Sequence, residues 1–260
     1  MDKQRVLASL RTLILIFYFL CISRTFHYVQ AHGRLWEPVA RSSMWRKHYG
    51  TPTNYQDNEL YCGGVTVQYK KNGGKCGVCG DPYDGPHPNE VNGRFATGII
   101  VRNYTEGQQV EAQVQLTANH KGWFMFTLCP KKKYSDPEPL DCFETHPLQI
   151  AGKNNTYKFP ITADMKLVKV NLSLPKGLSC PYCVFRWKYN AGNSWGVDPV
   201  TNGGCIGCGN QEQFYGCADV TIFPDPNKTS SASKFTWNKY YLWLLLTAAL
   251  VTGSVYSANI

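Results

Sequence analysis

The sequence predicts an all-β protein, a β-sandwich built from short antiparallel strands. Four segments alternate apolar with polar residues, as strands do when one face is buried and the other is wet. These segments cover residues 110–116, 168–174, 185–189 and 218–222, and residues 123–128 form a more continuous apolar strand. Glycine and proline separate the runs, and no long amphipathic helix is evident. Packed sheets are therefore favoured over a helical fold.

The segment 32–79 is less regular than the rest. It holds several aromatic residues between glycines and prolines, namely Trp36, Trp45, Tyr49, Tyr55, Tyr61 and Tyr69. We expect loops and short helices here, pinned by disulfides. Long ordered loops on a sandwich usually carry function.

The N-terminal end has the pattern of an export signal. Residues 1–11 are basic and polar, and residues 13–22 form an apolar run too short to span a bilayer comfortably. Small residues follow at Val29 and Ala31, the positions that a signal peptidase reads. We expect a signal peptide over residues 1–31, so that the mature chain begins at His32. The alternative is an uncleaved signal anchor.

The C-terminal end has the pattern of a second processing signal. A serine-rich polar stretch covers residues 227–233, and residues 240–256 are mostly apolar with no basic residues after them. This pattern favours a GPI-attachment signal, in which residues 234–260 are removed, over a transmembrane helix. Attachment is expected at Ser230, Ser231 or Ser233. We therefore expect one domain over residues 32–226, tethered by a stalk to the outer face of the plasma membrane.

Eleven cysteines are present, and one of them, Cys21, lies in the expected leader. The remaining ten are Cys62, Cys76, Cys79, Cys129, Cys142, Cys180, Cys183, Cys205, Cys208 and Cys217. An even number in an exported chain implies up to five disulfides, whose connectivity the sequence leaves open. Three Cys-x-x-Cys pairs would suggest structural zinc in the cytosol, but export favours disulfides. No thioredoxin-like pattern surrounds the pairs, which argues against a redox motif.

Four N-glycosylation sequons agree with an extracellular location. They begin at Asn103, Asn154, Asn171 and Asn227. The formal net charge is +9, but the Lys and Arg residues are scattered, and the tight run 131–133 suits a solvated loop. We therefore expect no nucleic-acid partner.

A histidine at a free N-terminus can bind a metal through two nitrogens, its α-amine and its ring Nδ1. One more imidazole completes a planar set of three nitrogens, which favours copper over zinc or calcium. Signal cleavage would create such a terminus at His32. The second imidazole must come from His48, His87, His120 or His146. We favour His120 because it directly follows a predicted strand, where a loop can aim its side chain at a neighbouring terminus.

An aromatic residue close to the last predicted strand could cover the axial position of this metal. Because side chains on a strand repeat every two residues, a polar residue two positions earlier would share its face. Two registers are open, Glu212 with Phe214 or Gln213 with Tyr215. The alternation of the last strand, extended backwards, favours Phe214. A bulge at Gly216 would swap the choice.

Four long motifs stand out between residues 32 and 224. They are His32-Gly-Arg-Leu with Pro38 and Arg41-Ser42, Cys76-Gly-Val-Cys-Gly-Asp81, Tyr189-Asn-Ala-Gly-Asn-Ser-Trp-Gly196, and Gly207-Cys-Gly209 through Gln211-Glu212 to Cys217-Ala-Asp219. With these motifs the chain resembles the lytic polysaccharide monooxygenases of auxiliary-activity family fifteen, and the resemblance covers nearly all of residues 32–224.

The resemblance implies an immunoglobulin- or fibronectin-III-like sandwich with long disulfide-pinned loops and a flat face around one copper ion per chain. It implies a histidine brace formed by the amine and Nδ1 of His32 and by Nε2 of His120. Ala118 corresponds to the small residue that crowds the axial side, and the axial aromatic falls within Phe214-Tyr215. Glu212 would be an acid near the oxygen-binding position.

The implied activity is oxidative cleavage of crystalline polysaccharide, chitin first and cellulose second, by a monomer. It uses an external electron donor and O2 or H2O2. We expect the sugar-stacking aromatics among Trp45, Tyr49, Tyr55 and Tyr69. One alternative is a hydrolase with two carboxylates. The other is a GPI-anchored copper- or glycan-binding surface protein without turnover.

Overall fold

The computed structural model describes residues 31–227. The chain divides into two units, Met1–Pro224 and Asp225–Ile260, and only the first three residues of the second unit are described. The expected leader before Ala31, the stalk beyond Asn227 and the C-terminal signal lie outside the described residues. Among the described residues no helix is long and apolar enough to cross a membrane.

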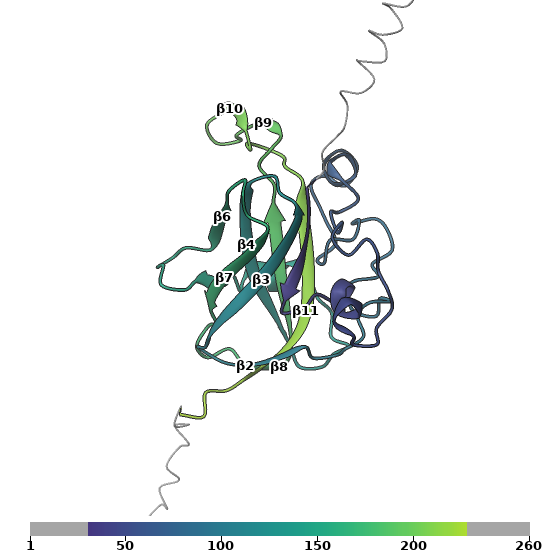
Figure 1. Ribbon diagram of the computed structural model, residues 1–260, viewed down its shortest axis with the longest axis vertical. Helices are drawn as coiled ribbons and strands as arrows, with labels where there is room; N and C mark the ends of the chain where they lie inside the picture. Colours follow the sequence, from purple (N-terminus) through teal and green to yellow (C-terminus); the bar gives the residue numbers. More distant parts are fainter. Residues whose placement is uncertain (1–30, 228–260) are drawn as a thin grey trace, which may run out of the picture. The chain divides into compact units, whose positions relative to one another are not determined.

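Two sheets form the body of the first unit (Figure 1). The first has the order β1-β3-β7-β5 and is antiparallel throughout; its strands are β1 (His32–Glu37), β3 (Gln109–Ala118), β5 (Gln149–Ile150) and β7 (Leu167–Ser173). The second has the order β2-β11-β8-β4-β6; its strands are β2 (Arg102–Thr105), β4 (Gly122–Lys131), β6 (Lys158–Ile161), β8 (Cys180–Asn190) and β11 (Gln213–Phe223). A separate hairpin pairs β9 (Trp195–Val197) with β10 (Gly204–Ile206). The predicted β-sandwich is confirmed; four of the five predicted segments lie within observed strands, and the segment 168–174 extends one residue beyond the end of β7.

The core lies between the two sheets. The alternating apolar residues of β3 and β7 point inward, with Val114 and Leu172 fully buried. They meet aromatic side chains from the second sheet, where the rings of Phe124 and Trp187 pack edge to face at 5.4 Å between centroids. Full burial of one such side chain contributes about 1.5–3 kcal/mol. The strands β8 and β11 are buried along most of their length, because loops cover their outer face.

The strand β1 is not anticipated by sequence periodicity. It pairs with β3, with His32 opposite Ala118 and Leu35 opposite Val114. Its neighbours cover it on both faces, so Gly33 and Arg34 are both buried and the apolar–polar alternation is lost. The rest of this segment follows expectation, with loops and the short helices η1 (Arg41–Lys47) and η2 (Thr66–Lys71). A third short helix, α2 (Leu140–Glu144), follows β4.

All ten cysteines of the domain form disulfides. The pairs are Cys62–Cys76, Cys79–Cys217, Cys129–Cys142, Cys180–Cys183 and Cys205–Cys208. Two of the three Cys-x-x-Cys pairs therefore close on themselves, and the third sends its cysteines to different partners. The Cys79–Cys217 bond ties the long loop to β11 across 138 residues. A cross-link over so long a separation removes much conformational freedom from the unfolded chain.

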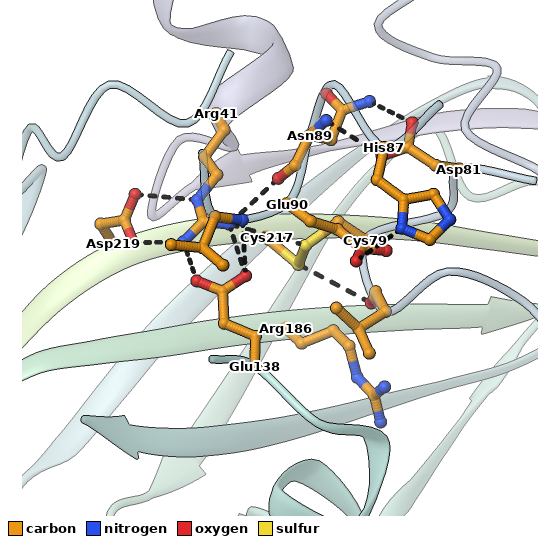
Figure 2. The surroundings of a disulfide bond; sticks show 12 residues. Arg41, Cys79, Asp81, His87, Asn89, Glu90, Glu138, Arg186, Cys217 and Asp219 are labelled. Atoms are coloured by element: carbon orange, nitrogen blue, oxygen red, sulfur yellow. Dashed lines mark hydrogen bonds and ion pairs between the residues drawn. A yellow bond between two sulfur atoms is a disulfide. The ribbon is translucent and has the colours of Figure 1, made fainter. Parts of the chain in front are cut away.

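A buried ion network joins η1 to β11 beside this disulfide (Figure 2). The guanidinium of Arg41 donates to both carboxylate oxygens of Asp219, at 2.6 and 2.8 Å, and to both of Glu138, at 2.7 and 2.9 Å. A further N–H of Arg41 donates to the carbonyl oxygen of Asn89 at 3.0 Å. Lys131 Nζ adds a bond of 2.7 Å to Glu138. The network holds the end of β11 that lies away from Phe214.

The network should make the free energy of unfolding depend on pH through Glu138. Burial alone would raise the pKa of this carboxyl, but the hydrogen bonds and charges of Arg41 and Lys131 outweigh burial and lower it. A carboxyl whose folded pKa is depressed stabilises the fold above its unfolded pKa, about 4.3, and loses that contribution as pH falls through the folded pKa. We expect the difference in unfolding free energy between wild type and Glu138→Gln to narrow from pH 7 to pH 3, measured by urea titration. A difference that stays constant would show that the pKa of Glu138 is the same in the folded and unfolded states.

Candidate metal centre

His32 and His120 meet at one end of the sandwich. His32 lies opposite Ala118 in the β1–β3 pair, and His120 follows two residues later. The turn that carries His120 connects β3 to β4, which belong to different sheets, so it crosses between the layers beside the start of β1. Burial, and then the charge of nearby His32, lower the pKa of His120. His32 and His120 were predicted as a pair from their places along the chain and from the family resemblance.

The turn at 119–122 is fixed by local bonds. The Asn119 side-chain amide donates to the carbonyl oxygens of Thr162 and Met165, at 2.8 and 2.7 Å, and its Oδ1 accepts from Lys121 N–H at 2.8 Å. Gly122 has a φ of +90°, and a Cβ there would collide with the carbonyl oxygen of Asn190. The turn therefore requires glycine at 122, both for its backbone conformation and for space.

His120 is held at its backbone and at its ring. Its N–H donates to the Tyr189 hydroxyl at 2.9 Å, and its carbonyl oxygen accepts from Gly192 N–H at 2.9 Å. The side-chain amide of Asn193 lies 2.6 Å from ring Nδ1. The other histidine, His32, has its Nε2 3.6 Å from a Glu59 carboxylate oxygen. Within residues 31–227, no hydrogen bond occupies Nδ1 of His32 or Nε2 of His120.

The structure separates the two candidate aromatics. Phe214 is 1% exposed, and its ring lies 6.2 Å from that of His32 and stacks on Tyr61 at 6.0 Å. Tyr215 points to the opposite face of β11, where its hydroxyl donates to Gln213 at 2.8 Å. The pairing of β11 with β8 has no register shift between residues 213 and 220, so Gly216 hosts no bulge. The alternation of the last strand therefore holds back to Phe214.

Glu212 lies with this group, and Gln213 does not. One carboxylate oxygen of Glu212 accepts from the backbone N–H of Ala31 at 3.2 Å, and Ala31 is fully buried. Burial raises the pKa of Glu212, and the bond from Ala31 acts in the opposite direction. Gln213 instead bonds to Gln68 of η2 at 2.9 Å.

The other three candidate histidines are held by their own local segments. His48 caps the end of η1 with a left-handed φ of 60° and is exposed. His87 has Nδ1 3.1 Å from a Glu90 carboxylate oxygen and Nε2 3.0 Å from the carbonyl oxygen of Pro82. His146 has Nδ1 2.8 Å from the carbonyl oxygen of Cys142.

Comparison with known families and structures shows what this chain is similar to. The family described as lytic polysaccharide mono-oxygenase, cellulose-degrading, matches residues 32–220. The structure of the auxiliary-activity family fifteen lytic polysaccharide monooxygenase from Thermobia domestica, in the Cu(I) state, is 40% identical over 74% of this chain and 99% of its own, with a TM-score of 0.71. This chain belongs to the lytic polysaccharide monooxygenases. More specifically, it belongs to auxiliary-activity family fifteen.

Two more distant structures are also similar. A chitin binding domain from Burkholderia pseudomallei is 13% identical over 74% of this chain and 100% of its own, with a TM-score of 0.41. The copper complex of the cellulose-active monooxygenase CelS2 is 18% identical over 73% of this chain and 98% of its own, with a TM-score of 0.41. No curated protein sequence matches this chain significantly.

As a member of its family, this monooxygenase is a copper-dependent enzyme that oxidises polysaccharide. The residues fit copper, because two imidazoles lie together and each has one ring nitrogen without a partner among the described residues. A cluster of three or more His, Cys, Asp or Glu side chains able to hold a metal is not found within the described residues. A brace needs only two such side chains. Lytic polysaccharide monooxygenases generally act outside the cell, in agreement with the five disulfides.

The aromatic residues expected to stack on sugars differ in exposure. Tyr55 is 75% exposed and packs edge-on against Trp45 at 5.5 Å. Tyr49 and Tyr69 are half-buried: Tyr49 packs against the core, and the Tyr69 hydroxyl donates to the carbonyl oxygen of Gln211 at 2.9 Å. Trp195, a residue outside that predicted set, is 70% exposed. It is flanked by serine and glycine and lies close in sequence to the Gly203-Gly204 pair.

Proposed function

We propose that the monooxygenase is cleaved after Ala31 and then holds one copper ion through three nitrogens. These are the new α-amine and Nδ1 of His32, and Nε2 of His120. The observation that carries the proposal is that the two rings come together with these two nitrogens unpartnered, while Glu59 and Asn193 face the other two. Bound copper would supply one-electron redox chemistry toward O2 or H2O2 after reduction by an external donor.

The surrounding residues would shape this site. Phe214 packs beside His32, and Ala118 is the neighbour of His32 across the β1–β3 pair; both would exclude water from a copper ion held by His32. Removal of Ala31 takes away the N–H that Glu212 accepts from, which leaves the carboxylate to hold or move a proton beside the new α-amine. We assign Tyr215 no role at the metal, because it faces away.

The proposed reaction is oxidation of a C–H bond at C1 or C4 of the glycosidic linkage in crystalline chitin, with cellulose as the second substrate. Purified copper-loaded protein is incubated with each polysaccharide and ascorbate, and the soluble products are analysed by mass spectrometry. Oxidised oligosaccharides are expected from at least one substrate. Binding without products on both would favour the alternative, a copper- or glycan-binding surface protein without turnover.

The proposed location is the cell surface, through a GPI anchor in the segment 230–233. N-terminal sequencing of the secreted protein should begin at His32, and a phosphatidylinositol-specific phospholipase C should release it from cells. The side chains of Asn103, Asn154, Asn171 and Asn227 are exposed, as glycosylation requires. Protein that begins at another residue, or that resists release, would contradict the respective part of the proposal.

Asn193 would act as a positioning residue for His120. A neutral imidazole that binds metal through Nε2 carries its proton on Nδ1, so the side chain facing Nδ1 must accept a hydrogen bond. In the structure the Asn193 Nδ2 lies 2.6 Å from Nδ1, and turning the amide by about 180° would put its carbonyl oxygen there as the acceptor. We expect Asn193→Ala to weaken copper binding by about 10- to 100-fold and Asn193→Asp to retain it, measured by calorimetric titration. Equal affinity in wild type and Asn193→Ala would remove this role.

A further inference from the structure

The β9–β10 hairpin begins immediately after the residues that contact His120. Gly192 donates to its carbonyl oxygen, and Asn193 lies against its ring. The chain then enters β9 at Trp195. Figure 1 shows β9 and β10 projecting beyond one end of the two sheets. We call residues 194–208 the arm.

One face of the arm is apolar and exposed. Ile206 pairs directly with Trp195, and Gly204 pairs with Val197. Opposed residues share a face and strand side chains repeat every two residues, so Trp195, Val197 and Ile206 lie on the same side. They are 70%, 55% and 68% exposed. An exposed apolar cluster of this kind marks an interaction site more often than a single exposed side chain does.

The arm offers almost no charge to a partner. Asp198 is the only charged residue in the segment 194–208. Its carboxylate accepts from the N–H groups of Val200 and Thr201, at 2.9 and 2.8 Å, and so it is used to close the turn. The composition favours an uncharged partner over nucleic acid, an acidic protein or a charged lipid surface.

The indole of Trp195 is held flat against the arm. A Cβ at Gly204 would collide with the six-membered part of the ring, which shows that the ring lies on the Gly204 backbone. Gly204 has no positive φ, so glycine is needed there for space and not for conformation. The opposite face of the ring is left to solvent.

The base of the arm is rigidly clamped. Gln211 is fully buried, and its amide accepts from Ser194 N–H at 3.1 Å and donates to the carbonyl oxygens of Ser194 and Cys208, at 3.0 and 2.5 Å. The Cys205–Cys208 disulfide closes the return strand. A preorganised aromatic loses little conformational entropy on binding, so more of its contact energy appears as affinity.

The apolar face is continuous with the candidate metal centre. A cavity of about 300 Å³ is lined by His120, Asn193 and Ile206, together with residues of the 119–121 turn and Ala163. Ile206 therefore borders both the arm's apolar face and the cavity that His120 lines.

We propose that the arm is a substrate-docking surface of this monooxygenase, with the exposed face of Trp195 stacking on the pyranose rings of a neutral polysaccharide chain that runs toward His120. The inference rests on the proposed function and extends it to a surface and a residue. The faces of β-linked pyranose rings are rows of C–H groups, which match a flat indole, whereas their hydroxyl edges suit a polar rim.

The test measures binding and turnover separately on the mature protein. Copper-stripped wild type, Trp195→Ala, Gly204→Ala and Phe223→Ala are titrated onto crystalline chitin and cellulose without reductant. Phe223 is a matched control, because it is 52% exposed and lies at the far end of β11. We expect Trp195→Ala to raise the Kd for the preferred polysaccharide about tenfold. Gly204→Ala keeps the indole of Trp195 but pushes it away from the backbone at position 204, so it should raise the Kd several-fold. Phe223→Ala should leave the Kd unchanged.

The outcomes separate this inference from the proposed function. If Trp195→Ala binds polysaccharide with the wild-type Kd while copper-loaded wild type still forms oxidised products, the docking role of the arm is overturned and the proposed function stands. If polysaccharide binding depends on Trp195 but copper-loaded wild type yields no oxidised products, the docking role of the arm is supported and the proposed enzymatic turnover is overturned. A concentration-dependent dimer that Trp195→Ala abolishes in sedimentation, with polysaccharide binding unchanged, would assign the patch to a second copy and overturn the proposal.

Discussion

Replacing His32 or His120 by alanine is expected to weaken copper binding by orders of magnitude while the sandwich stays folded. His32 contributes two of the three proposed nitrogens, and the His32→Ala chain retains only its amine. His120 contributes the third nitrogen, and no other side chain among the described residues is placed to replace it. The remaining donors would hold copper through fewer bonds and without a rigid chelate.

Both substitutions should leave the fold almost unchanged. His32 is the first residue of an edge strand, and its side chain is partly exposed. The backbone bonds that position His120, from its N–H to Tyr189 and from Gly192 to its carbonyl oxygen, survive in alanine. Circular dichroism and thermal unfolding of the metal-free proteins check this point.

The matched control for the histidine prediction is His48→Asn. His48 is exposed and has a φ of 60°, which asparagine tolerates better than alanine. Copper affinity measured by calorimetry should be the same as in wild type, and the electron paramagnetic resonance spectrum of Cu(II) should not change. Wild-type affinity in either His32→Ala or His120→Ala would rule out the brace.

The sequence was informative wherever one strand face is buried and the other is wet. The alternation at Val110–Leu116 and at Val168–Leu174 located β3 and β7 within a residue or two. The strand β1 was not predicted, because its successive residues Gly33 and Arg34 face opposite sides and both are buried. The strand therefore shows no apolar–polar alternation. Periodicity reports burial on one face, and it is silent for a strand enclosed by loops.

The metal centre was predictable only in part, for a related reason. His32 could be singled out because its chemistry depends on its place in the chain. The partners Asn193 and Gln211 act through bonds to ring and backbone atoms of residues far along the chain. Such bonds leave no periodic or spacing signal. Disulfide connectivity is hidden in the same way, since Cys79 and Cys217 are brought together only by the complete fold.

The second large effect is expected at Arg41, which is 1% exposed (Figure 2). Burial alone would lower its pKa, but hydrogen bonds to Glu138 and Asp219 outweigh burial and raise it, so the guanidinium stays charged. Removing the guanidinium leaves the buried carboxylates of Glu138 and Asp219 without their shared partner. Among the described residues only Glu138 then keeps a cation, Lys131. Breaking one side of a buried pair costs about 3–5 kcal/mol. We expect Arg41→Met to lower the free energy of unfolding by about that amount in urea titration.

The loss of unfolding free energy in Arg41→Met should come from the unpaired buried carboxylates and not from lost packing. Two further variants distinguish these causes. Arg41→Met combined with Asp219→Asn removes the carboxylate that has no other described cation, so it should be more stable than Arg41→Met alone. Arg41→Lys keeps the charge, but one ammonium cannot engage both carboxylates through paired bonds, so its stability should lie between wild type and Arg41→Met. If the double variant is instead less stable than the single one, the two residues act independently and the network is not a unit. Copper affinity should be close to wild type in every variant that folds, because Asp219 and Phe214 lie five residues apart on β11 and only Phe214 touches His32.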